Sequence, residues 1–227
     1  MKKLLILLLL SIIYNVNQIA AQKKEFYQAF VTNNPDTWRQ LLDQSLSNAY
    51  SSKNTLQNLE YLYGYIGWCI RDQRKEEAKK YLKIMEKLLN QDLSPFASNL
   101  YRSITLSYGI LLGTRNPVIN GPKIIKTVNK AIDEDASSPL GYIQKGNAYL
   151  NMPAVFGGSK SKALSFFIQA EKIFETTDNL TQNWLYLHLL CLISETYKQS
   201  NKTAIANNYY EKIKKLEPSL FWLRQQE

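Results

Sequence analysis

Residues 197–218 read YKQSNKTAIANNYYEKIKKLEP, and this stretch decides the fold. Helical periodicity on both sides of a polar turn at 200–201 predicts two helices joined by that turn. A small residue, Ala206, stands early in the second helix, Tyr210 follows four positions later, and Pro218 ends the helix. Two antiparallel helices approach closely only where one side chain is small, so the stretch predicts a closely packed helix pair.

The same arrangement recurs upstream. Helical periodicity dominates after residue 23, and no stretch alternates apolar and polar residues as a strand would, so we expect an all-α protein. Loops are expected at 114–122 and 152–158, where proline and glycine gather. The matching small, aromatic and apolar positions are Cys69, Ala78, Leu82 and Met85 in a first unit, Tyr101, Ile104, Tyr108, Val128 and Ala131 in a degenerate unit, and Gly146, Tyr149, Ala163, Phe167 and Ala170 in a middle unit.

At these positions the chain resembles the tetratricopeptide repeat family, in an exported bacterial form with degenerate repeats. The resemblance covers residues 53–218 and implies a right-handed α-solenoid of four to five antiparallel helix pairs, in which no pair buries its apolar face alone. Residues 22–52 match the repeat poorly and are expected to form an N-terminal helical cap. Residues 219–227 are expected to form a C-terminal tail, in which Phe221 and Trp222 cover the other end of the array.

The first 21 residues have the order of a secretory signal peptide. Lys2 and Lys3 precede an apolar run from Leu4 to Ile13, and small residues end at Ala21. The run is shorter than the roughly 20 residues of a membrane-spanning helix. We therefore expect an exported protein, periplasmic or extracellular in the cell envelope, and an uncleaved anchor is the alternative interpretation.

Composition argues against several classes of protein. The net charge is +9, but acidic residues lie among the basic ones, and an exported protein rarely meets nucleic acid, so no nucleic-acid partner is expected. Contact with a membrane is expected only through the signal segment before cleavage. Two cysteines, Cys69 and Cys191, are too few for a disulfide scaffold; two buried thiols are favoured, and a bridge stays open.

No pattern predicts catalysis, and we expect a protein that is not an enzyme. His188 is the sole histidine, so a zinc site of histidine and cysteine is not expected, nor is any other metal or cofactor. The Gly157–Ser161 segment lacks the glycine spacing of a phosphate-binding loop. The serine at position 159 is instead expected to cap the next helix.

The resemblance implies a concave face that is built from the first helices of the units and that holds a partner. Carried over position by position, it places nine partner-binding candidates there: Tyr63, Arg71, Asn99, Arg102, Asn147, Asn151, His188, Glu195 and Lys198. Asparagine can bond a peptide backbone through both its amide nitrogen and its oxygen, and arginine can hold a carboxylate.

Two functions remain open on this sequence. The first is a non-catalytic scaffold that binds a protein or an extended peptide. The alternative is a small-molecule-binding accessory component of a transport system, which the wealth of aromatic residues favours. A deep pocket in the structure would support the second function, and an open groove would support the first.

Overall fold

The computed structural model describes residues 21–47, 52–176 and 180–226. Throughout these ranges the regular secondary structure is helical, with no strand. The predicted signal peptide, apart from Ala21, lies outside the described residues. The helices are residues 21–31, α2 (Pro35–Ser47), α3 (Ser52–Arg71), α4 (Lys75–Leu88), α5 (Pro95–Leu111), α6 (Pro117–Glu134), α7 (Pro139–Asn151), the 3-10 turn η1 (Ala154–Phe156), α8 (Lys160–Glu175), α9 (Trp184–Lys198), α10 (Thr203–Leu216) and α11 (Phe221–Arg224).

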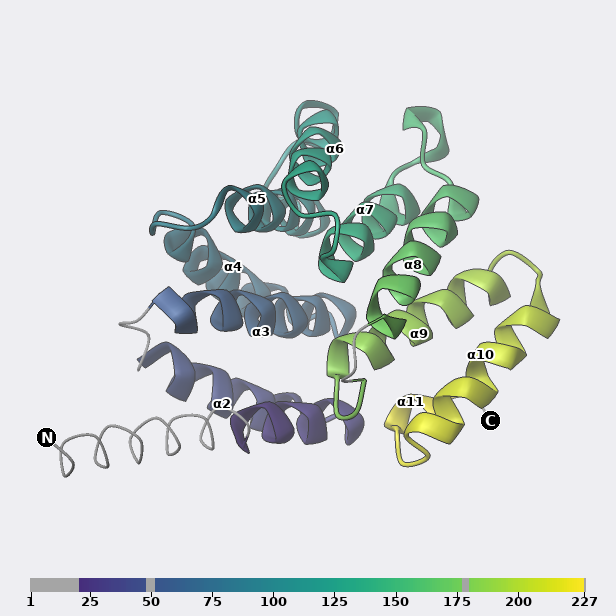
Figure 1. Cartoon of the computed structure of the whole chain (residues 1–227). Helices are drawn as coiled ribbons and strands as arrows, with labels where there is room; N and C mark the ends of the chain where they lie inside the picture. Colours follow the sequence, from purple (N-terminus) through teal and green to yellow (C-terminus); the bar gives the residue numbers. More distant parts are fainter. Residues whose placement is uncertain (1–20, 48–51, 177–179, 227) are drawn as a thin grey trace, which may run out of the picture.

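Consecutive helices pack as pairs, and the pairs stack into one curved array (Figure 1). Helices α3 and α4, α5 and α6, α7 and α8, and α9 and α10 form pairs, and each pair also contacts the next. In addition, α3 contacts α5 and α5 contacts α7, so the first helices of successive pairs share one side of the array. The predicted all-α solenoid is confirmed.

Small side chains mark the contacts within the pairs, as predicted. Ala78 and Ala163 are fully buried, and Ala206 is nearly so. A Cβ atom added at Gly146 would lie 2.4 Å from Cε1 of Phe167 on the facing helix, closer than carbon atoms can approach. The small residues on which the repeat interpretation rested therefore lie at contacts between helices.

The loop predicted at 114–122 was wrong in its second half, because α6 already begins at Pro117. The Asn116 side chain caps this helix by accepting hydrogen bonds from the backbone N–H groups of Val118 and Ile119, at 2.9 and 3.3 Å. Proline at the first helical position needs no hydrogen-bond partner there, and Pro122 is tolerated inside the helix. The prolines that were read as a loop signal thus belong to a capped helix start.

The expected turn at 152–158 is present. Helix α7 ends at Asn151, and η1 follows; Gly157 then adopts the left-handed conformation, with φ of 92°, which glycine accepts without strain. The Ser159 hydroxyl accepts a hydrogen bond from the backbone N–H of Lys162 at 3.3 Å, so it caps α8 as predicted.

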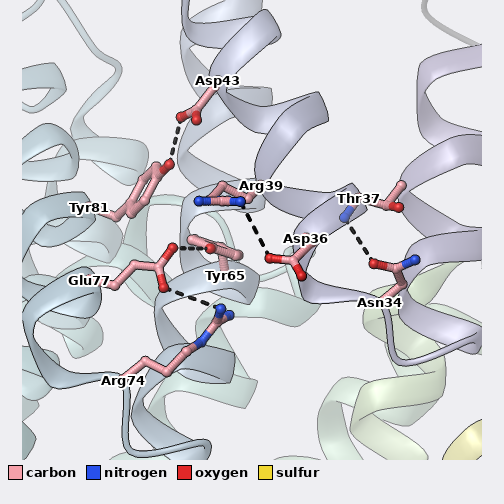
Figure 2. Close-up of polar contacts among 9 residues, drawn as sticks. All are labelled: Asn34, Asp36, Thr37, Arg39, Asp43, Tyr65, Arg74, Glu77 and Tyr81. Carbon is pink, nitrogen blue, oxygen red and sulfur yellow. Dashed lines mark hydrogen bonds and ion pairs between the residues drawn. The ribbon is translucent and has the colours of Figure 1, made fainter.

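The N-terminal segment packs on the first repeat unit through polar as well as apolar contacts. Figure 2 shows the Tyr81 hydroxyl donating to Asp43 at 2.7 Å and the Tyr65 hydroxyl donating to Glu77 at 2.5 Å. Arg74 completes the group through an ion pair with Glu77 at 3.2 Å. Of these contacts, the Tyr81–Asp43 bond joins α2 to the first pair, whereas the Tyr65–Glu77 bond ties α3 to α4 within that pair.

The curvature brings the two ends of the described chain together (Figure 1). The Tyr27 hydroxyl donates to Glu217 at 2.7 Å, and the Phe30 ring lies 5.9 Å from Trp184. Among the described residues, the main apolar core extends from Phe26 to Leu223, and a chain that starts at residue 21 keeps all of these core residues. The closed curve leaves a hollow on its inner side, where the first helices of the pairs face one another.

Candidate functional site

A cavity of about 1000 Å³ occupies this inner side. Its lining comes mainly from the first helices α3, α5, α7 and α9, from the start of α6, and from α11. All four tryptophans of the sequence contribute to the lining. Six of the nine predicted partner-binding residues meet here: Tyr63, Arg71, Asn147, Asn151, His188 and Glu195.

One face of α3 supplies a large part of the wall. Tyr63, Gly67 and Arg71 follow one another at a spacing of four residues, which places them on one side of the helix. Gly64 lies beside them, and a Cβ atom there would stand 2.8 Å from the Trp38 ring. The missing side chain lets the indole pack directly against the backbone of α3.

Aromatic rings form the floor. The Trp38 and Trp184 rings meet edge to face at 5.1 Å, and Trp38 also meets Trp68 at 6.0 Å. Tyr63 stacks on Tyr108 at 6.1 Å, and the Tyr108 hydroxyl donates to the backbone oxygen of Tyr63 at 2.8 Å. Rings held by other rings and by buried hydrogen bonds present a rigid apolar surface to whatever enters the cavity.

His188 stands on α9 among these rings. Its imidazole lies 6.3 Å from Phe30, 6.4 Å from Tyr63 and 6.4 Å from Trp184. Burial, together with the positive charge of Arg71, lowers the pKa of His188 from 6.5 to about 4. The imidazole is therefore neutral at neutral pH, and a neutral imidazole can accept a hydrogen bond or coordinate a metal.

This lowered pKa predicts a pH-dependent stability. The unfolded chain takes up a proton on His188 below about pH 6.5, whereas the folded chain resists it until about pH 4. The unfolded state is then favoured as the pH falls through this window. We expect His188→Gln to lose less free energy of unfolding than the unsubstituted chain between about pH 7.5 and about pH 4.5, measured by urea denaturation. Equal losses in both proteins would contradict the prediction.

Three charged residues border the cavity: Arg71, Lys162 and Glu195. The Arg71 side chain is 60% exposed, contacts Asp72 at 2.8 Å and Asn33 at 3.1 Å, and lies over the Trp68 ring at 5.4 Å. Its guanidinium has five N–H donors and so retains capacity for a further acceptor. Glu195 instead accepts a hydrogen bond from the Trp222 indole at 2.6 Å, which holds α11 against the cavity.

The two asparagines at the site already use their amide groups inside the protein. The Asn147 amide donates to the Tyr63 hydroxyl at 3.2 Å, and the Asn151 amide donates to the backbone oxygen of Asn147 at 2.9 Å. They therefore order the wall of the cavity, and they are less available to a peptide backbone than the sequence analysis expected.

Three predicted residues lie outside the cavity lining. Asn99 and Arg102 stand in the first half of α5, and the cavity uses only the second half, from Ser107 to Leu111. Lys198 ends α9 and donates to Gln226 at 3.1 Å. The cavity is lined by the C-terminal halves of α3, α5 and α7. We therefore predicted the correct face of α5 but chose residues in the wrong half of that helix.

Sequence reasoning missed Trp38, Trp184 and Trp222 as cavity residues. Trp38 and Trp222 were assigned to caps at the two ends of the array, and the closed curvature brings both to the centre. The signal that could have found Trp38 and Trp222 was that each lies on a helix that flanks the repeats, whereas Trp184 begins the first helix of the last pair. That signal gains meaning only once the ends are known to meet.

The two cysteines and the acidic residues of the described ranges do not form a reactive or metal-binding group at this site. Cys69 and Cys191 are both free and buried, and burial raises the pKa of each thiol. Within residues 21–47, 52–176 and 180–226, no three His, Cys, Asp or Glu side chains gather as a metal site would require. In the same ranges no helix has both the length and the hydropathy needed to cross a bilayer.

Comparison with known proteins informs on the fold alone. No family model and no curated protein matches the chain. Among solved structures, MamA (41-end) from Desulfovibrio magneticus RS-1 aligns with 84% of this chain and 99% of its own, at 12% identity and a TM-score of 0.41. The HusA haemophore from Porphyromonas gingivalis aligns with 80% of this chain and 94% of its own, at 18% identity and a TM-score of 0.54, so this chain is similar to HusA in its helical fold.

Proposed function

We propose that this protein is a non-catalytic binding protein that holds a small, flat, largely apolar ligand in the central cavity, and that an iron porphyrin is the ligand whose chemistry fits best. The observation that carries the proposal is the meeting of four tryptophans, Tyr63, His188 and Arg71 on one cavity of about 1000 Å³. Ligand pockets of this kind are mostly apolar, with a few polar groups that orient the ligand.

Each part of an iron porphyrin has a counterpart in the wall. The flat ring fits against the indole and phenol rings, because stacking and burial both favour such contact. The neutral imidazole of His188 is a suitable ligand for haem iron. The exposed guanidinium of Arg71 can pair with a carboxylate of the porphyrin. The similar fold of a haemophore supports the same ligand class.

A peptide partner, the main hypothesis from the sequence, has weaker support. Asn147 and Asn151, which were expected to bond a peptide backbone, donate inside the protein. An extended peptide would also need an open path along the array, whereas α11 and the Trp222–Glu195 bond close one side of the cavity. The small-molecule alternative is therefore the one that we carry forward.

The proposal also includes the location of the protein in the cell envelope. The resemblance of residues 53–218 to tetratricopeptide repeats and the signal-like order of residues 1–21 support an exported repeat protein of the cell envelope. A protein in that place could collect the ligand and pass it to a transport system.

Tryptophan fluorescence tests the proposal directly, because all four tryptophans line the cavity. We expect saturable quenching by haemin and by metal-free protoporphyrin. Arg71→Glu should weaken the binding of both probes roughly tenfold or more, because it replaces a favourable charge with a repulsive one. Arg102→Glu is the matched control, since Arg102 is exposed and lies outside the cavity lining.

The variant His188→Phe distinguishes binding through the haem iron from binding of the porphyrin ring. Phenylalanine keeps an aromatic group in place but cannot coordinate iron, so the variant should bind haemin more weakly and protoporphyrin about as well as before. Absorption spectra of the haemin complex should change with the same substitution. Absence of saturable quenching by both probes would overturn the porphyrin proposal.

A further inference from the structure

The rim of the cavity exposes an unusual set of apolar side chains. Val118, Ile119, Val155 and Phe156, which we call the apolar rim, are 63%, 59%, 86% and 59% exposed. They stand at the start of α6 and in the α7–α8 connection. In stacked helix pairs the turns within the pairs share one edge, and Figure 1 shows α6 and the α7–α8 connection projecting at the same edge of the molecule.

These side chains are held outward by well-defined local structure. The Asn116 cap and Pro117 fix the first turn of α6, which carries Val118. In the other turn, the Gly158 N–H donates to the Pro153 oxygen at 3.2 Å, and the Ser159 N–H donates to the Tyr149 oxygen at 3.0 Å. A folded turn that presents valine and phenylalanine to water is costly in free energy unless something covers them.

Lysines without neighbouring carboxylates flank the apolar rim along the sequence. Residues 116–132 contain three lysines and no carboxylate, and residues 136–170 again contain three lysines and no carboxylate before Glu171. Four of these side chains are exposed and close in sequence to the rim; they are Lys123, Lys126, Lys160 and Lys162. Among the ion pairs of the described residues, none involves these four lysines.

We propose that this edge docks on the surface of an anionic lipid bilayer. Apolar side chains on projecting turns enter the boundary between headgroups and acyl chains, and the neighbouring lysines pair with lipid phosphates. The charge pattern favours lipid over a second copy of this chain, because two identical lysine-rich edges repel each other. This departs from the sequence-based expectation that only the signal segment meets a membrane.

Docking in this orientation has a consequence for the cavity. Val118 and Phe156 belong both to the apolar rim and to the cavity lining, so the mouth of the cavity lies at the docking edge. An apolar ligand could then pass between bilayer and cavity with little exposure to water. The docking surface is nevertheless separable from the ligand site, because Ile119 and Val155 do not line the cavity.

Vesicle co-sedimentation tests the proposal on the chain from residue 21 onward, which excludes the apolar N-terminal run. We expect binding to vesicles of phosphatidylcholine with phosphatidylglycerol, weakening as salt increases, and little binding to pure phosphatidylcholine. The double substitution Ile119→Asp and Val155→Asp should reduce binding at least roughly tenfold. The matched control is Leu56→Asp with Leu216→Asp, which makes the same change in charge at two residues that are each 45% exposed.

Thermal unfolding of each variant shows that it is folded, so loss of binding can be assigned to the rim. Control-like binding by the rim variant would overturn the proposal, as would absence of binding to anionic vesicles. Self-association through the rim, seen as a concentration-dependent mass that the rim variant loses, would also overturn it, because the occupant would then be a second copy.

Discussion

Trp38→Ala is expected to lower the free energy of unfolding by about 3–5 kcal/mol, the largest single effect that we foresee. The Trp38 side chain is fully buried, and its indole N–H donates to the backbone oxygen of Tyr61 at 3.1 Å. Its ring meets Phe26 at 5.0 Å and Trp184 at 5.1 Å, so it joins the N-terminal segment to both α3 and the last helix pair. Truncation would open a void where the two ends of the array meet.

Urea denaturation followed by circular dichroism measures this effect. Trp222→Ala serves as the comparison, because that ring is half-buried on the last helix and bonds Glu195. We expect it to cost only about 1–2 kcal/mol. A loss below about 1 kcal/mol for Trp38→Ala would show that the closure of the array does not depend on this residue.

The sequence predicted the helix pairs because their contacts are local. Ala78 and Ala163 lie on α4 and α8, each of which packs on the helix that precedes it in the sequence, and a 3.6-residue period places such positions without knowledge of the rest of the chain. The inner face of α3 was found for the same reason. Tyr63 and Arg71 lie on one side of a helix, whatever the curvature of the array.

The closed curve could not be predicted, because contacts between distant residues set it. The Tyr27–Glu217 hydrogen bond joins positions 190 apart in the sequence, and no local pattern records it. Small rotations between successive pairs add up along a solenoid, so the end of the chain is the hardest part to place. Trp184 and Trp222 were missed as cavity residues for this reason.

The position of the cavity along the length of its helices was the second feature that the sequence could not predict. The face of a helix follows from periodicity, but the level at which neighbouring helices leave a hollow depends on side-chain volumes in three dimensions. Arg102 was assigned to the inner face of α5 in the half of the helix that the cavity does not use. Asn147 does line the cavity, but its bond to Tyr63 gives it a supporting part that sequence reasoning could not see.

Gly146→Ala should lower the free energy of unfolding by about 1–3 kcal/mol, although alanine favours helices more than glycine does. The new methyl group would lie 2.4 Å from Cε1 and 2.5 Å from Cδ1 of Phe167, whose ring is fully buried and loses packing contacts if it shifts. Either the ring leaves its position or α7 and α8 separate, and both responses weaken the pair that carries half of the apolar rim.

Gly121→Ala provides a control without a contact to another helix. Gly121 also lies inside a helix, but outside its own helix backbone and its chain neighbours no atom comes within 4 Å of an added Cβ. The helix propensity of alanine favours this substitution, and the ring of Pro122 opposes a Cβ on the preceding helical residue, so we expect the free energy of unfolding to change by less than about 1 kcal/mol. Chemical denaturation under the same conditions compares the free energies of unfolding of both variants. If Gly146→Ala were as stable as Gly121→Ala, the close contact of α7 with Phe167, and with it the role of small residues in pairing the helices, would be refuted.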